Sequence, residues 1–144
     1  YAHTPEAVQK VLSSLREVCQ GQLIAVLGCG GDRDKTKRPI MGNAAAQIAD
    51  VVIVTDDNPR SEKPSEIRAQ VLAGITGGKA KVLEIADRRE AIKAALSKAS
   101  DADVIAVLGK GHEEGQIVKD KILPFSDQQV VREILSNQSL CRLA

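Results

Sequence analysis

The chain has 144 residues and a formal net charge of +1; 43% of its residues are hydrophobic and only 1% are aromatic. A chain of this length buries roughly 70% of its extended surface, so we expect one domain with a core of Ala, Val, Ile and Leu. The balanced charge and scarce aromatic residues argue against a nucleic-acid partner, which needs a basic surface and stacking platforms.

The sequence also argues against membranes, disulfides and metal sites. Its longest apolar runs have about five residues, whereas a membrane span needs about 18. No signal segment opens the chain, and the three cysteines are scattered without a Cys-x-x-Cys pair. We therefore expect a cytoplasmic protein with no membrane partner and no metal site. Because the chain opens at Tyr1 rather than Met, we expect a fragment of a longer protein.

The first predicted element is a helix with its apolar face over Val8–Val18. Thr4 is a suitable N-cap for it, and Pro5 suits its first position. The apolar run Leu23–Leu27 predicts a strand, and the stripe Ile40–Ile48 predicts the next helix.

The same alternation continues through the middle of the chain. Val51–Val54 predicts a second strand, followed by a helix entered through Pro64. The short run Val82–Leu83 predicts a third strand, and Asp87 with Glu90 forms a capping box for the helix after it.

The last part predicts a strand over Val104–Leu108 and a small hairpin within Gln116–Leu123. A final helix starts from a capping box at Ser126 and is expected to end near Ser136, with a frayed tail to Ala144. Continuous apolar strands are typical of parallel sheets buried on both faces. The pattern therefore predicts an α/β fold, a three-layer αβα Rossmann-like domain with a mostly parallel sheet.

Ligands of such sheets bind outside the carboxyl ends of the strands, so we examined the loops that leave those ends. The first loop has three glycines and four cations: Arg33, Lys35, Lys37 and Arg38. It suits an anion, either phosphate or carboxylate, although a solvated turn is the alternative. It is neither a dinucleotide fingerprint nor a Walker A loop. Cys29 in this loop is interpreted as a small buried thiol.

The loops after the second and fourth strands add charges of both signs. Asn58-Pro59 predicts a turn that presents Arg60 as a bidentate partner for a carboxylate, with a plain Asx-turn as the alternative. In the loop after the fourth strand, Glu113 suits an ammonium group, and His112 alone is weak support for a ligand. Together these charges complement a zwitterion such as an amino acid.

Four motifs occur in order along the chain: Tyr1-Ala-His-Thr-Pro5, Gly28-Cys-Gly-Gly-Asp-Arg-Asp-Lys-x-Lys-Arg-Pro39, Asp57-Asn-Pro-Arg60 and Gly109-Lys-Gly-His-Glu113. With them, essentially the whole chain resembles the C-terminal domain of the Mur ligases. More specifically, it resembles the MurE branch, which adds meso-diaminopimelate to UDP-N-acetylmuramoyl-L-alanyl-D-glutamate. The resemblance implies that residues 1–144 form one Mur ligase C-terminal domain.

The resemblance also implies a cytoplasmic, monomeric, ATP-dependent ligase of peptidoglycan synthesis. In that family an N-terminal domain binds the UDP moiety, and a central domain holds ATP and Mg²⁺. Both domains are expected to lie outside this chain, which would then carry no catalytic residue of its own.

Carried over motif by motif, the family's meso-diaminopimelate contacts fall on a set of loop residues: Arg33, Asp57, Asn58, Pro59, Arg60, Gly109 and Glu113. In this interpretation the two arginines bind carboxylates, and Glu113 takes an ammonium. Arg60 would enforce diaminopimelate over lysine, because lysine lacks the distal carboxylate. Weaker nucleotide or hinge contacts are expected at His3, Thr4, Lys35 and Lys37.

Two alternatives remain open. In the first, the chain is another Mur-type or a folylpolyglutamate-type ligase domain; the motif Asp57-Asn-Pro-Arg60 argues against this alternative. In the second, it is a non-catalytic amino-acid-binding module of the same fold.

Overall fold

The computed structural model describes the backbone of residues 1–143 and the side chains of residues 1–138. Helices and strands alternate along that part of the chain, as predicted. They are α1 (Pro5–Val18), β1 (Leu23–Leu27), α2 (Lys37–Ile48), β2 (Val51–Val54), α3 (Pro64–Ala73), β3 (Lys81–Glu84), α4 (Arg88–Lys98), β4 (Val104–Val107), β5 (Gly115–Val118), β6 (Lys121–Pro124) and α5 (Asp127–Leu143).

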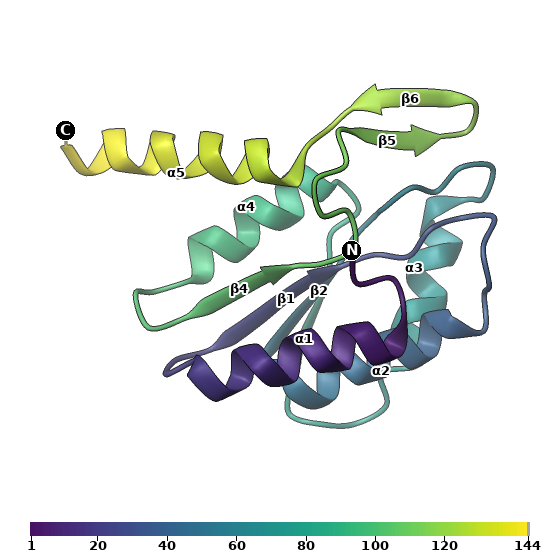
Figure 1. Ribbon diagram of the computed structural model, residues 1–144, viewed down its shortest axis with the longest axis horizontal. Helices are drawn as coiled ribbons and strands as arrows, with labels where there is room; N and C mark the ends of the chain where they lie inside the picture. The colour runs from purple at the N-terminus through teal and green to yellow at the C-terminus, as the bar shows by residue number, and fades with distance from the viewer. Residues whose placement is uncertain (144) are drawn as a thin grey trace.

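The strands β3-β2-β1-β4 form a parallel sheet in that order, with helices on both faces (Figure 1). Side chains of a strand point alternately to opposite faces, so Leu23 and Ala25 pack with α1, α2 and α3. Ile24 and Val26 pack with α4 and α5 on the other face. The three-layer Rossmann-like prediction is therefore confirmed.

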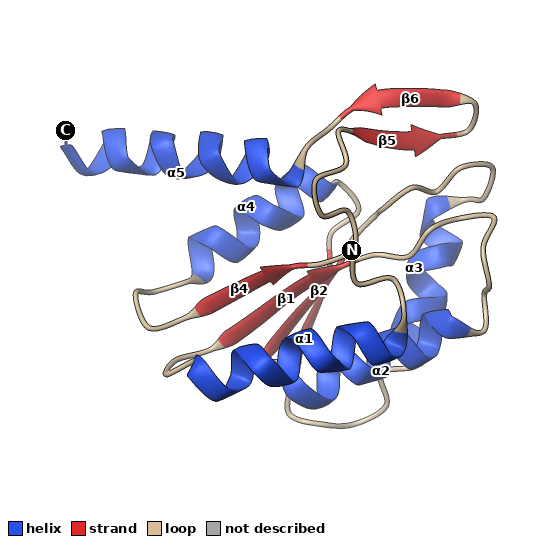
Figure 2. Ribbon diagram, in the orientation of Figure 1, coloured by secondary structure: helices blue, strands red, loops and turns tan. Residues whose placement is uncertain are grey.

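The connections of the sheet define where a ligand is expected. From β1 the chain passes through α2 to β2 on one side, whereas β4 pairs with β1 on the other side. The loops that leave β1 and β4 therefore diverge at this switch point. The crevice between such loops is the usual ligand site of open α/β sheets. The antiparallel β5–β6 hairpin lies beyond the carboxyl ends of the strands (Figure 2).

Local capping follows the sequence signals. Thr4 Oγ1 accepts from the Ala7 N–H at 3.1 Å, and Asp87 Oδ1 accepts from the Glu90 N–H at 2.9 Å. The predicted end of the last helix near Ser136 is wrong, because α5 continues to Leu143. No glycine or proline follows Ser136, so nothing interrupts its backbone hydrogen bonds. The predicted fraying at Ala144 lies outside the described residues.

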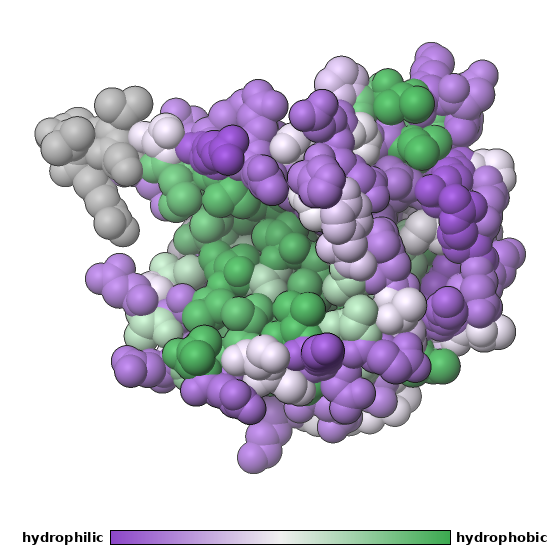
Figure 3. All heavy atoms as spheres, viewed as in Figure 1, coloured by the Kyte–Doolittle hydropathy of each residue, from purple (hydrophilic) through white to green (hydrophobic). Residues whose placement is uncertain are grey.

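The expectation that all four strands are buried on both faces is wrong for the two outer strands. β1 and β2 are buried throughout, but β3 and β4 are mostly half-buried or exposed, since each is an edge strand. Figure 3 shows apolar side chains gathered between α1 and α5, where β4 forms the edge. None of the described helices combines the length and apolar composition needed to cross a bilayer.

A buried ion pair joins the helices on one face to the end of β4. Arg88 Nε and Nη2 each lie 2.7 Å from an oxygen of Asp127 at the start of α5. Arg88 Nη2 also donates to the Leu108 carbonyl at 3.0 Å. Both side chains are buried, so each charge depends on the other for compensation.

We predict that Asp127→Ala lowers the free energy of unfolding by about 3–5 kcal/mol, because it leaves the Arg88 guanidinium buried without a counter-charge. The matched control is Glu133→Ala, which breaks the exposed Arg89–Glu133 pair and should cost less than about 1 kcal/mol. Urea unfolding of both variants measures the difference, and equal losses would contradict this account.

Candidate functional site

A pocket of about 440 Å³ opens at the carboxyl edge of the sheet, beside the switch point between β1 and β4. This volume is in the range of small-ligand sites. Most of the predicted contacts line it: Arg33, Asp57, Asn58, Arg60, Glu113, His3, Thr4 and Lys37. The predicted residues Pro59, Gly109 and Lys35 are not part of its lining.

Glycines in the loop after β1 allow close packing against the loop after β2. A Cβ atom on Gly31 would lie 1.9 Å from the Pro59 carbonyl oxygen, and one on Gly28 would lie 2.4 Å from that of Thr55. The Gly31 N–H donates to the Asn58 carbonyl at 2.7 Å. These glycines therefore let the two loops pack together, and the Gly31 N–H is bound to the Asn58 carbonyl within the protein.

Arg38, one of the four predicted loop cations, lines the pocket, but its Nη1 and Nη2 groups already bind protein acceptors. Its side chain is 1% exposed and donates to both carboxylate oxygens of Glu62, at 3.0 and 2.7 Å. It also donates to Gln70 Oε1 and to the Gly30 carbonyl, both at 2.9 Å. Arg38 thus links the loops after β1 and β2 from inside.

Glu62 is the common partner of this loop pair. Besides Arg38, it accepts from the Asp32 N–H at 2.6 Å and lies 3.5 Å from Lys35 Nζ. The hydrogen bonds from the Arg38 guanidinium lower the pKa of Glu62 to about 2. Lys35 itself remains 63% exposed at the rim.

Arg60 is held in an unusual backbone conformation beside the pocket. Its φ of 51° is in the left-handed region, which non-glycine residues rarely adopt. Two backbone hydrogen bonds fix it there: its N–H donates to Ile117, and its carbonyl accepts from Lys119. Its Nη1 donates to the Gly31 carbonyl at 2.9 Å, its one hydrogen-bonding side-chain contact among the described residues. Further guanidinium donors are therefore available to a ligand.

Arg33 lies at the exposed mouth of the pocket. Its Nη1 donates to the Asp32 carbonyl at 2.9 Å, so the side chain is only loosely restrained. The pocket therefore has one firmly positioned guanidinium on its wall, from Arg60, and one exposed guanidinium at its entrance, from Arg33.

The N-terminal segment packs on the loop after β4. The Tyr1 hydroxyl lies 2.7 Å from His112 Nε2, and the ring covers Gly111, whose φ is 59°. His3 Nε2 lies 3.9 Å from Glu113 Oε1. His3, which lines the pocket from this segment, therefore lies next to the Glu113 carboxylate.

From the sequence, Lys110 is only a positive charge in the loop after β4 with no predicted site role; in the structure it is wholly buried between the loops after β2 and β4. The flanking Gly109 and Gly111, both at positive φ, were the available signal that the chain turns inward here. The interpretation of Cys29 is confirmed: its thiol is buried 3.7 Å from Met41 Sδ, and burial raises the pKa of Cys29 to about 12.

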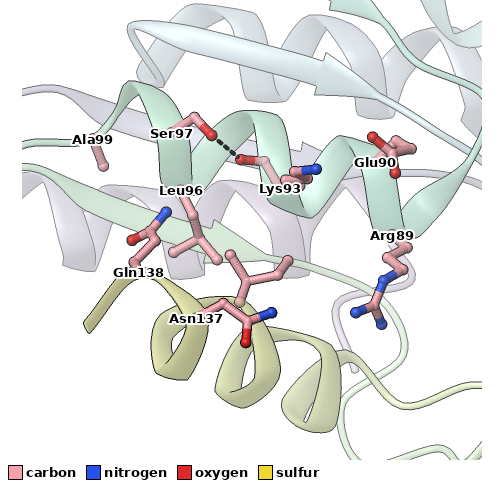
Figure 4. Close-up of a pocket in the computed structure, with 9 residues that line it drawn as sticks. Arg89, Glu90, Lys93, Leu96, Ser97, Ala99, Asn137 and Gln138 are labelled. Carbon is pink, nitrogen blue, oxygen red and sulfur yellow. Dashed lines mark hydrogen bonds between the residues drawn. The ribbon is translucent and has the colours of Figure 1, made fainter. Parts of the chain in front are cut away.

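Two other hollows are found among the described residues. One, of about 550 Å³, lies between α4 and α5 (Figure 4), where Leu96 of α4 points toward α5 beside Asn137. The other, of about 880 Å³, lies beside the hairpin and the starts of α4 and α5. Neither is lined by a predicted contact residue, so the 440 Å³ pocket is the candidate site.

Comparison with known proteins found a matching family model and close relatives. Residues 1–111 match the family described as Mur ligase, glutamate ligase domain. A UDP-N-acetylmuramoyl-L-alanyl-D-glutamate–2,6-diaminopimelate ligase from Brucella melitensis is 57% identical over 136 residues, which are 94% of this chain and 27% of that protein. The chain thus spans about a quarter of the length of this relative.

Solved structures agree with this match. The structure of a UDP-N-acetylmuramoyl-L-alanyl-D-glutamate–2,6-diaminopimelate ligase superposes with a TM-score of 0.92 at 45% identity, covering 96% of this chain and 28% of that one. A bifunctional folylpolyglutamate synthase/dihydrofolate synthase from Yersinia pestis gives a TM-score of 0.56 at 20% identity, over 95% of this chain and 27% of that one. The second likeness is one of fold alone.

We predict that ionised Glu62 contributes stability in full above its ordinary pKa of 4.5. Because the folded-state pKa is depressed to about 2, this contribution is lost as the pH falls through that range. Glu62→Gln should remove this part of the pH dependence, so the wild-type and variant stabilities should converge at low pH. Urea unfolding across this range measures it, with Glu66→Gln on the exposed face of α3 as the control. A constant difference between wild type and Glu62→Gln at every pH would contradict the assignment.

Proposed function

This chain belongs to the Mur ligase family, as a glutamate ligase domain, and on that premise we propose that it is the amino-acid-binding domain of an ATP-dependent ligase. The ligase would add meso-diaminopimelate to UDP-N-acetylmuramoyl-L-alanyl-D-glutamate in peptidoglycan synthesis. The observation that carries this proposal is the single pocket that gathers the guanidiniums of Arg33 and Arg60 with the carboxylate of Glu113. The 57% identity to a ligase of that name supports the choice of substrate.

The pocket has the charges that this substrate needs. Meso-diaminopimelate has an ammonium and a carboxylate at each end, so it needs cationic and anionic partners within one site. In our proposal Arg60 binds the carboxylate that remains distant from the reacting amine, and Arg33 closes over the other end. Glu113, whose side chain is 31% exposed, receives an ammonium group.

In the reaction this chain holds and orients the amine. ATP would transfer its terminal phosphoryl group to the acceptor carboxylate of the UDP-linked substrate, giving an acyl phosphate and ADP. The neutral amine of diaminopimelate then attacks the carbonyl carbon, the amide bond forms with loss of a proton from nitrogen, and phosphate leaves. Holding the nucleophile in a fixed position next to the acceptor provides the entropic advantage of an intramolecular reaction.

The basic rim of the pocket is suited to a phosphate group. Lys37 and Thr4 line the pocket, and Lys35 is exposed beside it. We propose that the two lysines approach ATP when the domains close, with His3 and Thr4 next to the connection to the rest of the protein. The described residues contain no cluster of three side chains suited to a metal ion, so we assign Mg²⁺ to the central domain.

The wider architecture is part of the same proposal. Residues 1–144 form the C-terminal domain, and the UDP-binding and central ATPase domains belong to the remaining three quarters of a protein as long as its relatives. A cytoplasmic location and a monomeric state remain predictions. The folylpolyglutamate alternative is less well supported, since that likeness has 20% identity against 45% for the diaminopimelate ligase.

We predict that Arg60→Ala in the intact ligase reduces the preference for meso-diaminopimelate over lysine, by up to about 10⁴-fold, because the distal carboxylate loses its partner. The ratio of kcat/KM values for the two amino acids measures it. Lys63→Ala, an exposed cation three residues further on, is the matched control and should keep the preference. An unchanged preference in Arg60→Ala would refute the role of Arg60. A wild-type ligase that does not use diaminopimelate would refute the proposed function.

We predict that Lys35→Ala and Lys37→Ala together raise the KM for ATP about tenfold, as expected for the loss of one charge-assisted hydrogen bond. The KM for diaminopimelate should change less, since Lys35 is outside the pocket lining and Lys37, although in the lining, is not one of the proposed partners of the diaminopimelate charges. Steady-state kinetics of the intact ligase provide both values, with Lys10→Ala on α1 as the control. An unaltered KM for ATP would remove the nucleotide role from this loop.

A further inference from the structure

Lys110 is a fully buried ammonium that joins three segments beneath the pocket. Its Nζ donates to Asn58 Oδ1 and to the Gly115 carbonyl, both at 2.8 Å. It also lies 3.2 Å from Asp57 Oδ1 and 3.6 Å from Glu113 Oε2. A buried ammonium is very costly unless its charge is compensated and it is hydrogen-bonded; here two carboxylates compensate the charge and two acceptors bind the ammonium hydrogens. Lys110 itself does not line the pocket, so any effect on a ligand passes through its neighbours.

The first of these neighbours is the amide of Asn58. Its Oδ1 receives hydrogen bonds from Lys110 Nζ and, at 2.9 Å, from the Ile117 N–H. Both partners can only donate, so the amide oxygen must face them. The Nδ2 group is thereby turned to the other side, toward the pocket, where it lies 3.4 Å from Glu113 Oε2. The orientation of this amide follows from its hydrogen-bond network.

The second effect concerns charge. Two carboxylates, Asp57 and Glu113, lie around the single ammonium of Lys110. Asp57 is 2% exposed, and its Oδ1 accepts no hydrogen bond among the described residues, so Lys110 is its compensating charge. Glu113 is farther away and 31% exposed toward the pocket. One negative charge therefore remains for a ligand ammonium to neutralise.

We propose that Lys110 is a positioning residue for the amino-acid substrate. It fixes Asn58 as a hydrogen-bond donor to the ligand, and it compensates Asp57 so that Glu113 remains the ammonium acceptor. This inference rests on the proposed function of the pocket and deepens it. It explains how the site can bind a ligand that has both an ammonium group, for Glu113, and a nearby hydrogen-bond acceptor, for the Asn58 NH₂.

The test is a double-mutant cycle in the intact ligase with Lys110→Met and Asn58→Ala. Lys110→Met should raise the KM for meso-diaminopimelate at least tenfold while leaving the KM for ATP near its wild-type value. On the Asn58→Ala background the same change should have a clearly smaller effect, because Lys110 acts partly through that amide. Lys121→Met, an exposed lysine on β6, is the matched control. A wild-type KM for diaminopimelate in Lys110→Met, or effects that simply add in the cycle, would overturn the proposal.

A second variant keeps the test decisive if Lys110→Met does not fold. Asn58→Asp preserves the oxygen that Lys110 holds and replaces the NH₂ by an oxygen beside Glu113 Oε2, so it removes the donor while keeping the contact with Lys110. We expect at least a tenfold higher KM for diaminopimelate in a protein that still unfolds cooperatively in urea; an unchanged KM would overturn the proposal. If wild-type enzyme uses lysine or glutamate in place of diaminopimelate, the proposed function fails, whereas the cycle run with that amino acid still decides the role of Lys110.

Discussion

The carboxyl edge of this domain depends on one constraint, which is that a buried cation must find a carboxylate on another segment. Arg38 pairs with Glu62, Lys110 lies against Asp57, and Arg88 pairs with a carboxylate at the start of α5. Each contact joins segments that the sheet alone would leave separate: the loops after β1 and β2, those after β4 and β2, and the helices α4 and α5. Since an uncompensated buried charge is strongly destabilising, these pairs hold the loops in one arrangement.

This arrangement divides the charged side chains of the loops into two sets. The inner set comprises the buried ion pairs described above; its charges are compensated within the protein, and it sets the shape of the pocket. The outer set, with Arg33, Arg60 and Glu113, lines the pocket and retains capacity for a ligand. Gly28 and Gly31 also help to set this shape, because they let the loops after β1 and β2 approach within hydrogen-bonding distance. A rigid inner layer is what allows a small polar site to discriminate between similar amino acids.

Much of the fold could be predicted because its signals are local. Continuous apolar runs indicated the four parallel strands, and the caps at Thr4 and Asp87 depend on a residue only three positions away. The loops of the site could also be located, since ligands of such sheets bind at the carboxyl ends of strands. The half-burial of β3 and β4 was not predictable, because strand order decides which strands lie at an edge.

The sequence by itself determined the order of strands and helices, the positions of the loops, and the charge types that a ligand would meet. It also contained the four motifs that identify the family. Only the tertiary structure decided which cations remain available: Arg38 and Arg60 look equivalent in the sequence and both line the pocket, yet Arg38 is bound to the Glu62 carboxylate whereas the Arg60 side chain donates only to the Gly31 carbonyl among the described residues. The physical reason is that these partners are distant along the chain, 24 residues for Arg38 and Glu62 and 52 for Lys110 and Asn58, so only folding brings them together.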